Sequence, residues 1–221
     1  INLGLDRTTI PMEEASDDEE PQLVVQYRMG YVGTFCITDE NCEVLVTRRY
    51  AVPSHEGPSR ILERMKADLL HALAKNPKLN IGVVQDGAPE MWNLLEEWFT
   101  AETFVGEIDR LVDLHHLMEK LGTAARVIQG PDASGNKLGE WKLHLLNRSR
   151  AAEGILEELV ASGLDEGPGE GHPVHAAITY LQSHSQAADR MNYARARRLG
   201  LALASGNVEA TCKSLFEIRL K

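Results

Sequence analysis

The order of β-rich and helical segments is the feature of this sequence that most constrains its fold. Short apolar runs predict strands at 1–7, 79–85 and 110–114, and two longer β-rich stretches separated by a polar turn predict strands at 23–37 and 42–52. Apolar residues at helical spacing predict one helix over 59–75 and another that begins at Pro89. Three strands followed by alternating helices and strands favour a mixed α/β sheet with right-handed crossovers in its parallel part.

Three strands, a helix, a strand, a helix, a strand and a last helix form the order of a ribonuclease-H-like fold. We therefore expect an α/β protein with a ribonuclease-H-like, mixed five-stranded sheet flanked by helices. Between residues 122 and 200 the β signal disappears, and a glycine-rich stretch at 163–171 interrupts a helical pattern. The expected organisation is a first part of the core at 1–121, an all-helical insertion with one flexible loop at 122–200, and a final core helix at 201–221.

Three acidic residues lie at the ends of these predicted elements. Asp6 and Asp86 end short apolar strands, and Glu209 lies near the start of the last amphipathic helix. If strands and helix converge, three carboxylates meet at one edge of the sheet and repel one another unless hard divalent cations lie between them. Enzymes that act on phosphodiesters commonly use two Mg²⁺ or Mn²⁺ ions about 3.5–4 Å apart. The three acids therefore predict a metal-dependent enzyme that acts on a nucleic-acid backbone.

Each of these acids also has a purely structural interpretation. Asp6 could simply end a strand, Asp86-Gly87 is a common turn dipeptide, and Glu209 with Lys213 is an ordinary i,i+4 helix pair. The catalytic interpretation depends on all three acids occurring together in this fold order.

The net charge is the main argument against a nucleic acid as partner, because affinity for DNA normally comes from lysine and arginine. The formal net charge is −10, but six acids fall in the run 13–20, which is predicted to be a solvated loop, so the rest carries about −4 (−10 + 6). Four arginines that precede Glu209 are candidate DNA contacts, although such a run is often only a solvated helix face: Arg190, Arg195, Arg197 and Arg198.

Composition indicates a cytoplasmic protein without a membrane segment. No apolar run approaches the ~20 residues of a membrane helix, and no signal-peptide pattern is present. The three cysteines, Cys36, Cys42 and Cys212, are too few for a disulfide scaffold, so we expect reduced thiols. The chain starts at Ile1 directly on a predicted strand, so a fragment that lacks an amino-terminal region is expected.

Four sequence motifs in this order resemble the catalytic domain of bacterial insertion-sequence transposases of the DDE type, most closely the Kra-type group, which is related to Mutator-like elements. The motifs are GLDRTTIPMEE at 4–14, QDGAPEMW at 85–92, LVDLHHL at 111–117 and GLALASGNVEA at 200–210. The last motif departs from the family pattern, which commonly has Pro before a Gly-Ser-Gly turn and Gly where Ala204 stands. Neither departure removes a predicted ligand.

The resemblance implies DNA cleavage and strand transfer at transposon ends. Asp6 and Asp86 would share two Mg²⁺ (or Mn²⁺) ions, and Glu209 would complete one of the two sites. Asp113 and His116 match an acid-x-x-His signature of related transposases, which implies a supporting role near the active site, although a histidine at such a junction is as often structural. The implied partner is DNA, with a homo-oligomer assembled on it, in a bacterial cytoplasm next to the nucleoid.

Two other function classes stay open from the sequence. A nuclease of the same fold would use the same acids without joining DNA ends, and a decayed or domesticated transposase domain would serve only as a binding module.

Three histidines near the glycine-rich stretch could indicate a metal site: His172, His175 and nearby His184. No cysteine pair accompanies them, and a glycine-rich loop precedes them, so the sequence favours a loop without a metal at this position.

Overall fold

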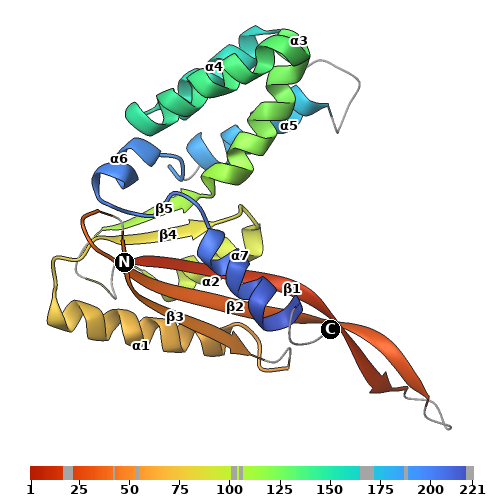
Figure 1. Cartoon of the computed structure of the whole chain (residues 1–221), viewed down its shortest axis with the longest axis vertical. Coiled ribbons are helices and arrows are strands. Elements are labelled where there is room, and N and C mark those ends of the chain that lie inside the picture. Colours follow the sequence, from red (N-terminus) through yellow and green to blue (C-terminus); the bar gives the residue numbers. More distant parts are fainter. Residues whose placement is uncertain are drawn as a thin grey trace.

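The computed structural model shows a mixed five-stranded sheet with helices packed on it, as in ribonuclease-H-like folds, and confirms the predicted fold class (Figure 1). The structure describes residues 1–16, 22–41, 43–52, 55–100, 104, 107–164, 172–186 and 189–217.

The sheet has the strand order β3-β2-β1-β4-β5. Its strands are β1 (Asn2–Ala15), β2 (Leu23–Thr38), β3 (Val44–Val52), β4 (Ile81–Gln85) and β5 (Ile108–Val112). The first three strands pair antiparallel, whereas β4 pairs parallel to both β1 and β5. All residues of β4 are buried, as expected of a parallel strand that is covered on both faces.

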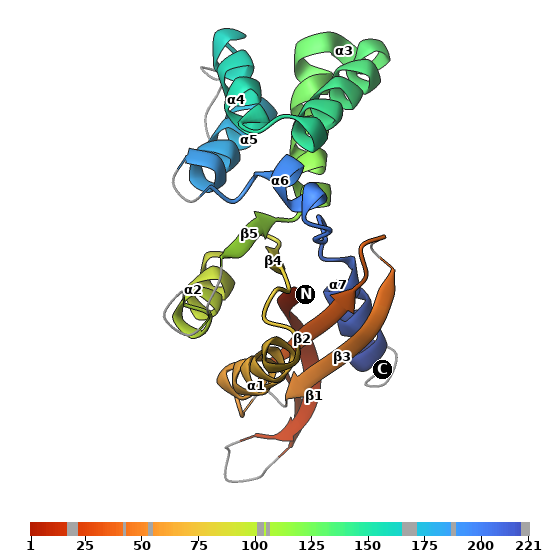
Figure 2. The same ribbon diagram turned by 90° about the vertical axis from the view of Figure 1, so that its left-hand side faces the viewer.

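Helices cover both faces of the sheet. Helices α1 (Ser59–Lys75) and α2 (Pro89–Trp98) pack on one face, and α7 (Gly206–Cys212) packs on the other (Figure 2). The predicted helix over 59–75 is confirmed, and its apolar stripe faces the sheet with Ile61, Leu62, Met65, Leu69 and Ala72 buried. Pro89 stands in the first turn of α2, where its missing N–H removes no hydrogen bond.

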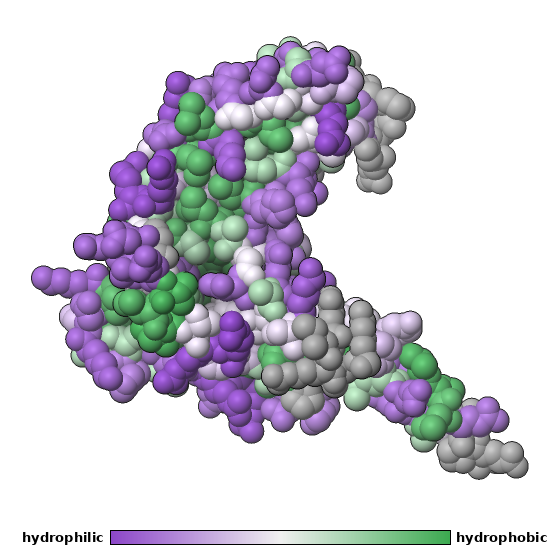
Figure 3. All heavy atoms as spheres, in the orientation of Figure 1, coloured by the Kyte–Doolittle hydropathy of each residue, from purple (hydrophilic) through white to green (hydrophobic). Residues whose placement is uncertain are grey.

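The segment between β5 and α7 is helical and forms a second lobe. It consists of α3 (Leu114–Asn147), α4 (Ala151–Ala161), α5 (Pro173–Leu181), the π-helical turn η1 (Gln182–Gln186) and α6 (Tyr193–Arg198). Helix α3 bends at Gly130, which has a φ of 77° and precedes Pro131. The boundary expected at 121/122 falls within α3, and most of the glycine-rich stretch 163–171 lies outside the described residues. The surface is hollowed between the two lobes (Figure 3).

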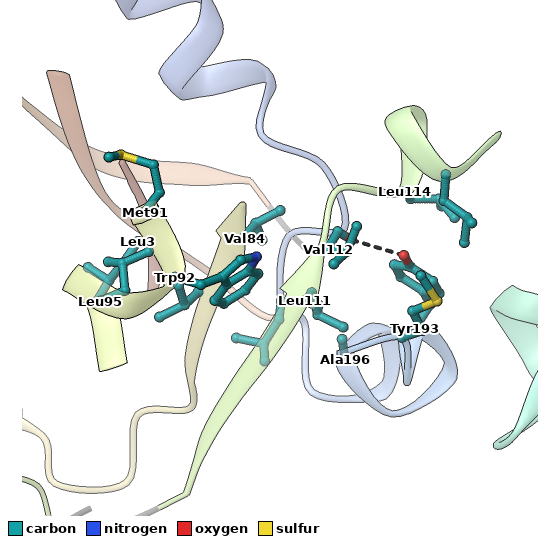
Figure 4. Packing of buried hydrophobic residues seen from close by; sticks show 14 of the residues in the cluster. Leu3, Val84, Met91, Trp92, Leu95, Leu111, Val112, Leu114, Tyr193 and Ala196 are labelled. Atoms are coloured by element: carbon teal, nitrogen blue, oxygen red, sulfur yellow. Dashed lines mark hydrogen bonds between the residues drawn. The ribbon is translucent and has the colours of Figure 1, made fainter. Parts of the chain in front are cut away.

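Helix α6 brings the chain back from this lobe to the sheet. Tyr193 is fully buried, and its hydroxyl donates a 2.9 Å hydrogen bond to the carbonyl oxygen of Val112 at the end of β5. Figure 4 shows β5 between Tyr193 on one side and Trp92 of α2 on the other. One continuous core therefore joins the helical lobe to the sheet.

The prediction for the first strand was too short. Strand β1 continues to Ala15 and pairs with β2 along its whole length, so the two strands form a hairpin arm that projects from the core (Figure 1). Glu13 and Glu14, which were predicted to lie in a solvated loop, belong to this arm, and 17–20 lie outside the described residues. A two-stranded ribbon beyond the core exposes both faces, so the apolar alternation that identifies a strand is absent there.

None of the helices in the described ranges combines the length and the apolar character needed to cross a membrane.

Candidate active site

Two of the predicted acids lie on neighbouring parallel strands at the same level of the sheet. In the register of β1 and β4, Asn2 lies opposite Gly82 and Leu3 opposite Val83. Continuation of this register places Asp6, within β1, beside Asp86, which directly follows β4. The buried Gln85 ties the strands together there, because its side-chain Oε1 accepts a 3.4 Å hydrogen bond from the amide of Leu5.

Helix α7 brings the third acid to this position. A Cβ at Gly4 would lie 3.3 Å from the Cβ of Val208, so the glycine allows α7 to pack closely on β1. Ser205 precedes the helix, and Glu209 lies in its first turn. The last predicted acid therefore faces the strand that carries the first one.

A pocket of about 120 Å³ lies where these elements meet. It is lined by the three predicted acids Asp6, Asp86 and Glu209, together with Leu5, Gln85, His116, Ser205 and Val208. The structure thus brings three acids that are far apart in the sequence to one cavity, and adds a histidine and a serine to them.

The electrostatics of Asp6 show that the charges of the other two acids act on it. Burial raises the pKa of Asp6, hydrogen bonds from Cys212 and from the amide of Arg7 partly offset this, and the charges of Asp86 and Glu209 raise the pKa further. A divalent cation bound between these carboxylates would relieve the repulsion that acts on Asp6.

A buried aspartate organises the other side of the pocket. Asp113 is 1% exposed and caps α3, because its Oδ1 accepts hydrogen bonds from the amides of His115 and His116 at 2.5 and 3.3 Å. Its Oδ2 accepts hydrogen bonds from the hydroxyl and, at 2.5 Å, from the amide of Ser205. Burial alone would raise the pKa of Asp113, but these hydrogen bonds hold the pKa below its usual value, so the carboxylate stays ionised.

The same serine connects Asp113 to Glu209. The Ser205 hydroxyl lies 2.9 Å from Oε1 of Glu209 and is also within hydrogen-bonding distance of Asp113. A hydroxyl carries one proton and can donate to only one of the two carboxylates at a time. The Ser205 hydroxyl therefore donates either to Asp113 or to Glu209, and it lies between the two carboxylates.

One group of side chains in the described part of the chain has the geometry of a metal site. Asp113, His116 and Glu209 each offer one ligand atom, and these atoms all lie within 4.8 Å of one another. The Nδ1 atom of His116 is buried and has no hydrogen-bond partner among the described residues. Carboxylate oxygens suit Mg²⁺ and Mn²⁺, and an imidazole nitrogen suits transition metals, so the donor set fits a divalent cation.

The predicted trio and this metal group overlap without being identical. Glu209 belongs to both, whereas Asp6 and Asp86 line the pocket but do not belong to the group. The sequence singled out Asp113 and His116 only as supporting residues. The assignment of Asp6, Asp86 and Glu209 as catalytic metal ligands stays a prediction.

Two side chains of the helical lobe pack against the turn that carries Asp86. The hydroxyl of Tyr180 donates a 3.2 Å hydrogen bond to the carbonyl oxygen of Asp86. A Cβ at Gly87, whose φ is 103°, would lie 3.1 Å from this hydroxyl and 3.2 Å from Nε2 of His184. Burial, together with the charges of Arg190 and Lys120 and against the opposing charge of Asp86, lowers the pKa of His184 to about 4, so the imidazole is neutral at pH 7. No sequence pattern indicated Tyr180 as part of the site.

Three of the arginines that were predicted to contact DNA have partners within the chain. Arg190 stacks over the ring of Trp92 at 4.2 Å and hydrogen-bonds Glu96 at 2.5 Å. Arg195 hydrogen-bonds Asp109 at 2.6 Å and Glu107 at 2.5 Å, and Arg197 hydrogen-bonds Asn147 at 3.1 Å. Arg198 lines a separate cavity beside Ile1 and Lys78. Contact of these arginines with DNA stays a prediction.

The remaining candidates of the sequence lie outside the pocket lining. His172 precedes α5, and His175 is exposed in its first turn. Cys36 is buried in β2, Cys42 lies outside the described residues, and Cys212 hydrogen-bonds Asp6.

Comparisons with protein-family models, with curated proteins and with solved structures found no match. The features that bear on function are therefore the ribonuclease-H-like sheet topology and the Asp113, His116 and Glu209 group at an acidic pocket, which are features of a nuclease-type active site.

Proposed function

We propose that this chain is the catalytic domain of a DDE-type transposase, which cleaves DNA and joins transposon ends to a target in a metal-dependent reaction. The observation that carries the proposal is the pocket to which β1, the end of β4 and α7 each contribute one carboxylate, Asp6, Asp86 and Glu209. The rise that the charges of Asp86 and Glu209 cause in the pKa of Asp6 supports a site built for cations.

Asp6 and Asp86 would hold two Mg²⁺ or Mn²⁺ ions between them, and Glu209 would complete one of the two sites. When bound, such a pair of ions activates the attacking water or DNA 3′-hydroxyl and stabilises the leaving oxygen. The protein supplies the position of the ligands, because Asp6 lies within β1 and Asp86 directly follows the neighbouring strand β4.

Ser205 and Asp113 would keep Glu209 in place for this role. The Asp113 carboxylate fixes the start of α3 and, through Ser205, the start of α7. His116 enters the pocket from the first turn of α3, with a ring nitrogen that has no hydrogen-bond partner among the described residues. One ring nitrogen of His116 belongs to the group of ligand atoms that could hold a metal ion.

The positions of the family-like motifs support the transposase class within the ribonuclease-H-like folds. The four motifs come from distant parts of the sequence, and each of them contributes a residue to the pocket or its supports: Asp6, Asp86, Asp113 with His116, and Glu209. The partner that follows from this function is DNA, bound by a homo-oligomer.

Replacement of Glu209 by Gln tests the proposal. The change keeps the size of the side chain but removes a charge from the metal site, so nicking of a supercoiled plasmid in Mn²⁺ should fall by at least ~100-fold, equivalent to about 2.7 kcal/mol of barrier. Glu63→Gln, an exposed change on α1, is the control and should nick at the wild-type rate.

The same reaction separates joining from hydrolysis when a labelled short duplex with free 3′-hydroxyls is added. Transfer of label to the plasmid is the expected result. Nicking that depends on Glu209 but never transfers label would instead identify a nuclease of this fold. Nicking that survives Glu209→Gln would reject the active site itself.

A further inference from the structure

An acidic pocket cannot hold a nucleic acid by itself, because the phosphates that react carry the same charge as its walls. Binding of a phosphate backbone needs lysine or arginine close by. Arg190 and Arg195 are already bound to acidic side chains, Glu96 in one case and Glu107 with Asp109 in the other. A different cation is therefore needed at the pocket.

Lys120 on α3 is such a cation. It follows His116, which lines the pocket, by four residues, so both side chains lie on the same face of the helix. Lys120 is exposed, and it forms no ion pair with an acidic side chain in the described ranges. Its charge is thus available to a ligand from solution.

An aromatic side chain holds the ammonium of Lys120 close to the turn that carries Asp86. Its Nζ lies over the ring of Tyr180, 5.0 Å from the ring centre, and the Tyr180 hydroxyl donates to the carbonyl oxygen of Asp86. A cation–π contact restrains the position of the ammonium without using an anionic partner. The effects of Lys120 and Asp86 on the same imidazole, that of His184, agree with this proximity.

We propose that Lys120 binds a backbone phosphate of the nucleic-acid strand whose neighbouring phosphodiester lies in the acidic pocket, and that Tyr180 positions Lys120 for this contact. The inference rests on the proposed function, since it concerns the substrate of the same pocket. Lys120 lies four residues, or about 6 Å along the helix axis, beyond His116. A phosphate at Lys120 is therefore a different group from the one at the pocket, which points to a polymer and not to free phosphate.

The test is the binding of a fluorescent oligonucleotide, measured by anisotropy with Ca²⁺ in place of Mg²⁺ at several salt concentrations. Lys120→Ala should weaken binding about 5–10-fold and reduce the slope of log K against log salt by about 0.7–0.9, which corresponds to one phosphate contact. Lys142→Ala, an exposed change farther along α3, is the matched control and should leave both values unchanged.

Tyr180 variants test the positioning role. Tyr180→Phe keeps the ring under Lys120 and should retain the salt slope, whereas Tyr180→Leu should lower the slope toward that of Lys120→Ala. An unchanged slope in Lys120→Ala, an equal loss in Lys142→Ala, or no oligonucleotide binding by the wild type would each overturn the proposal. Inorganic phosphate that binds through Lys120 as tightly as the oligonucleotide would overturn the assignment to a strand.

Two further readouts separate this inference from the proposed function. The rise in melting temperature with Mn²⁺ should be the same in Lys120→Ala as in the wild type, because Lys120 is not a metal ligand. Oligonucleotide binding that depends on Lys120 in a chain that never nicks DNA would support the phosphate contact and reject the catalytic function. Nicking by Lys120→Ala with an unchanged KM would support the catalytic function and reject the phosphate contact of Lys120.

Discussion

At the scale of single residues, Asp6 shows how the pocket opposes folding when no cation is bound. Burial, with the charges of Asp86 and Glu209, raises its folded-state pKa above the unfolded value, so ionisation of Asp6 destabilises the native chain. The stabilising contribution of Asp6 is complete below its unfolded pKa and is lost as the pH rises through the folded pKa. Such a conflict is typical of residues that are retained for function.

Asp6→Asn should therefore raise the melting temperature of the metal-free protein at pH 7 by a few degrees, the size of effect that about 1 kcal/mol produces in a chain of this length. The gain should vanish below about pH 4, where Asp6 is protonated in both states. Thermal melts in EDTA from pH 3.5 to 8 measure this. Addition of Mn²⁺ should make the wild type melt at a higher temperature than Asp6→Asn. A melting temperature of Asp6→Asn below that of the wild type in EDTA at pH 7 would contradict the account.

Ser205, unlike ionised Asp6, stabilises the folded chain at neutral pH, because its hydrogen bonds stabilise the buried charge of Asp113. The pKa of Asp113 is held low, so the stability from this network is present above the unfolded pKa of an aspartate and is lost as the pH falls through the lower, folded pKa. Ser205→Ala should cost about 1.5–3 kcal/mol at pH 7, the usual contribution of a hydrogen bond to a charged group.

Denaturant unfolding of Ser205→Ala at pH 7 and pH 3 checks this expectation. The loss should be smaller at pH 3, and the control Ser183→Ala, which removes an exposed hydroxyl that donates to the carbonyl of Thr179, should change stability by less than about 0.5 kcal/mol. Equal losses at both pH values would show that Ser205 contributes packing and not support of the Asp113 charge.

At the scale of elements, the sequence predicted the parts of the fold that bury an apolar pattern. The helix at 59–75 and the strand that became β4 carry continuous or periodic apolar residues, and both are confirmed. The outer half of β1 was missed because its pairing with β2 depends on backbone hydrogen bonds and on cross-strand pairs such as Glu14 with Arg28. Such pairs leave no periodic signal in one strand.

The turn after β4 is one of the places where the two lobes meet. Gly87 has a φ of 103°, and a Cβ there would approach the Tyr180 hydroxyl to 3.1 Å. Gly87→Ala should therefore destabilise the chain by about 1–3 kcal/mol through backbone strain and displace the insertion from Asp86. Gly154→Ala, within α4 and with open space around it, should instead stabilise by about 0.5–1 kcal/mol.

Chemical denaturation gives both stability changes, and the Mn²⁺-dependent rise in melting temperature shows whether the Asp86 turn has moved. This rise should shrink in Gly87→Ala and persist in Gly154→Ala. A Gly87→Ala variant with wild-type stability and wild-type response to metal would show that the packing of Tyr180 on this turn is not needed.

At the scale of the whole molecule, the helical lobe supports the pocket and packs against the sheet. It begins at Asp113, which caps α3 and binds Ser205, and it returns through Tyr193 against β5. The sequence singled out the acids because each lies at the end or near the start of a predicted element. It could not locate Tyr180 or Lys120, since their roles arise from contacts between residues far apart in the chain, which only the packed lobes create.

The central claim is that the acids of β1, β4 and α7 hold divalent cations together. Crystals of the chain soaked in Mn²⁺, with anomalous diffraction, test it most directly. The account predicts two anomalous peaks about 3.5–4 Å apart in the pocket, within bonding distance of Asp6, Asp86 and Glu209. Strong peaks only in the acidic run 13–20, or a single peak on Asp113 and His116 that leaves Asp6 and Asp86 without a metal, would contradict it.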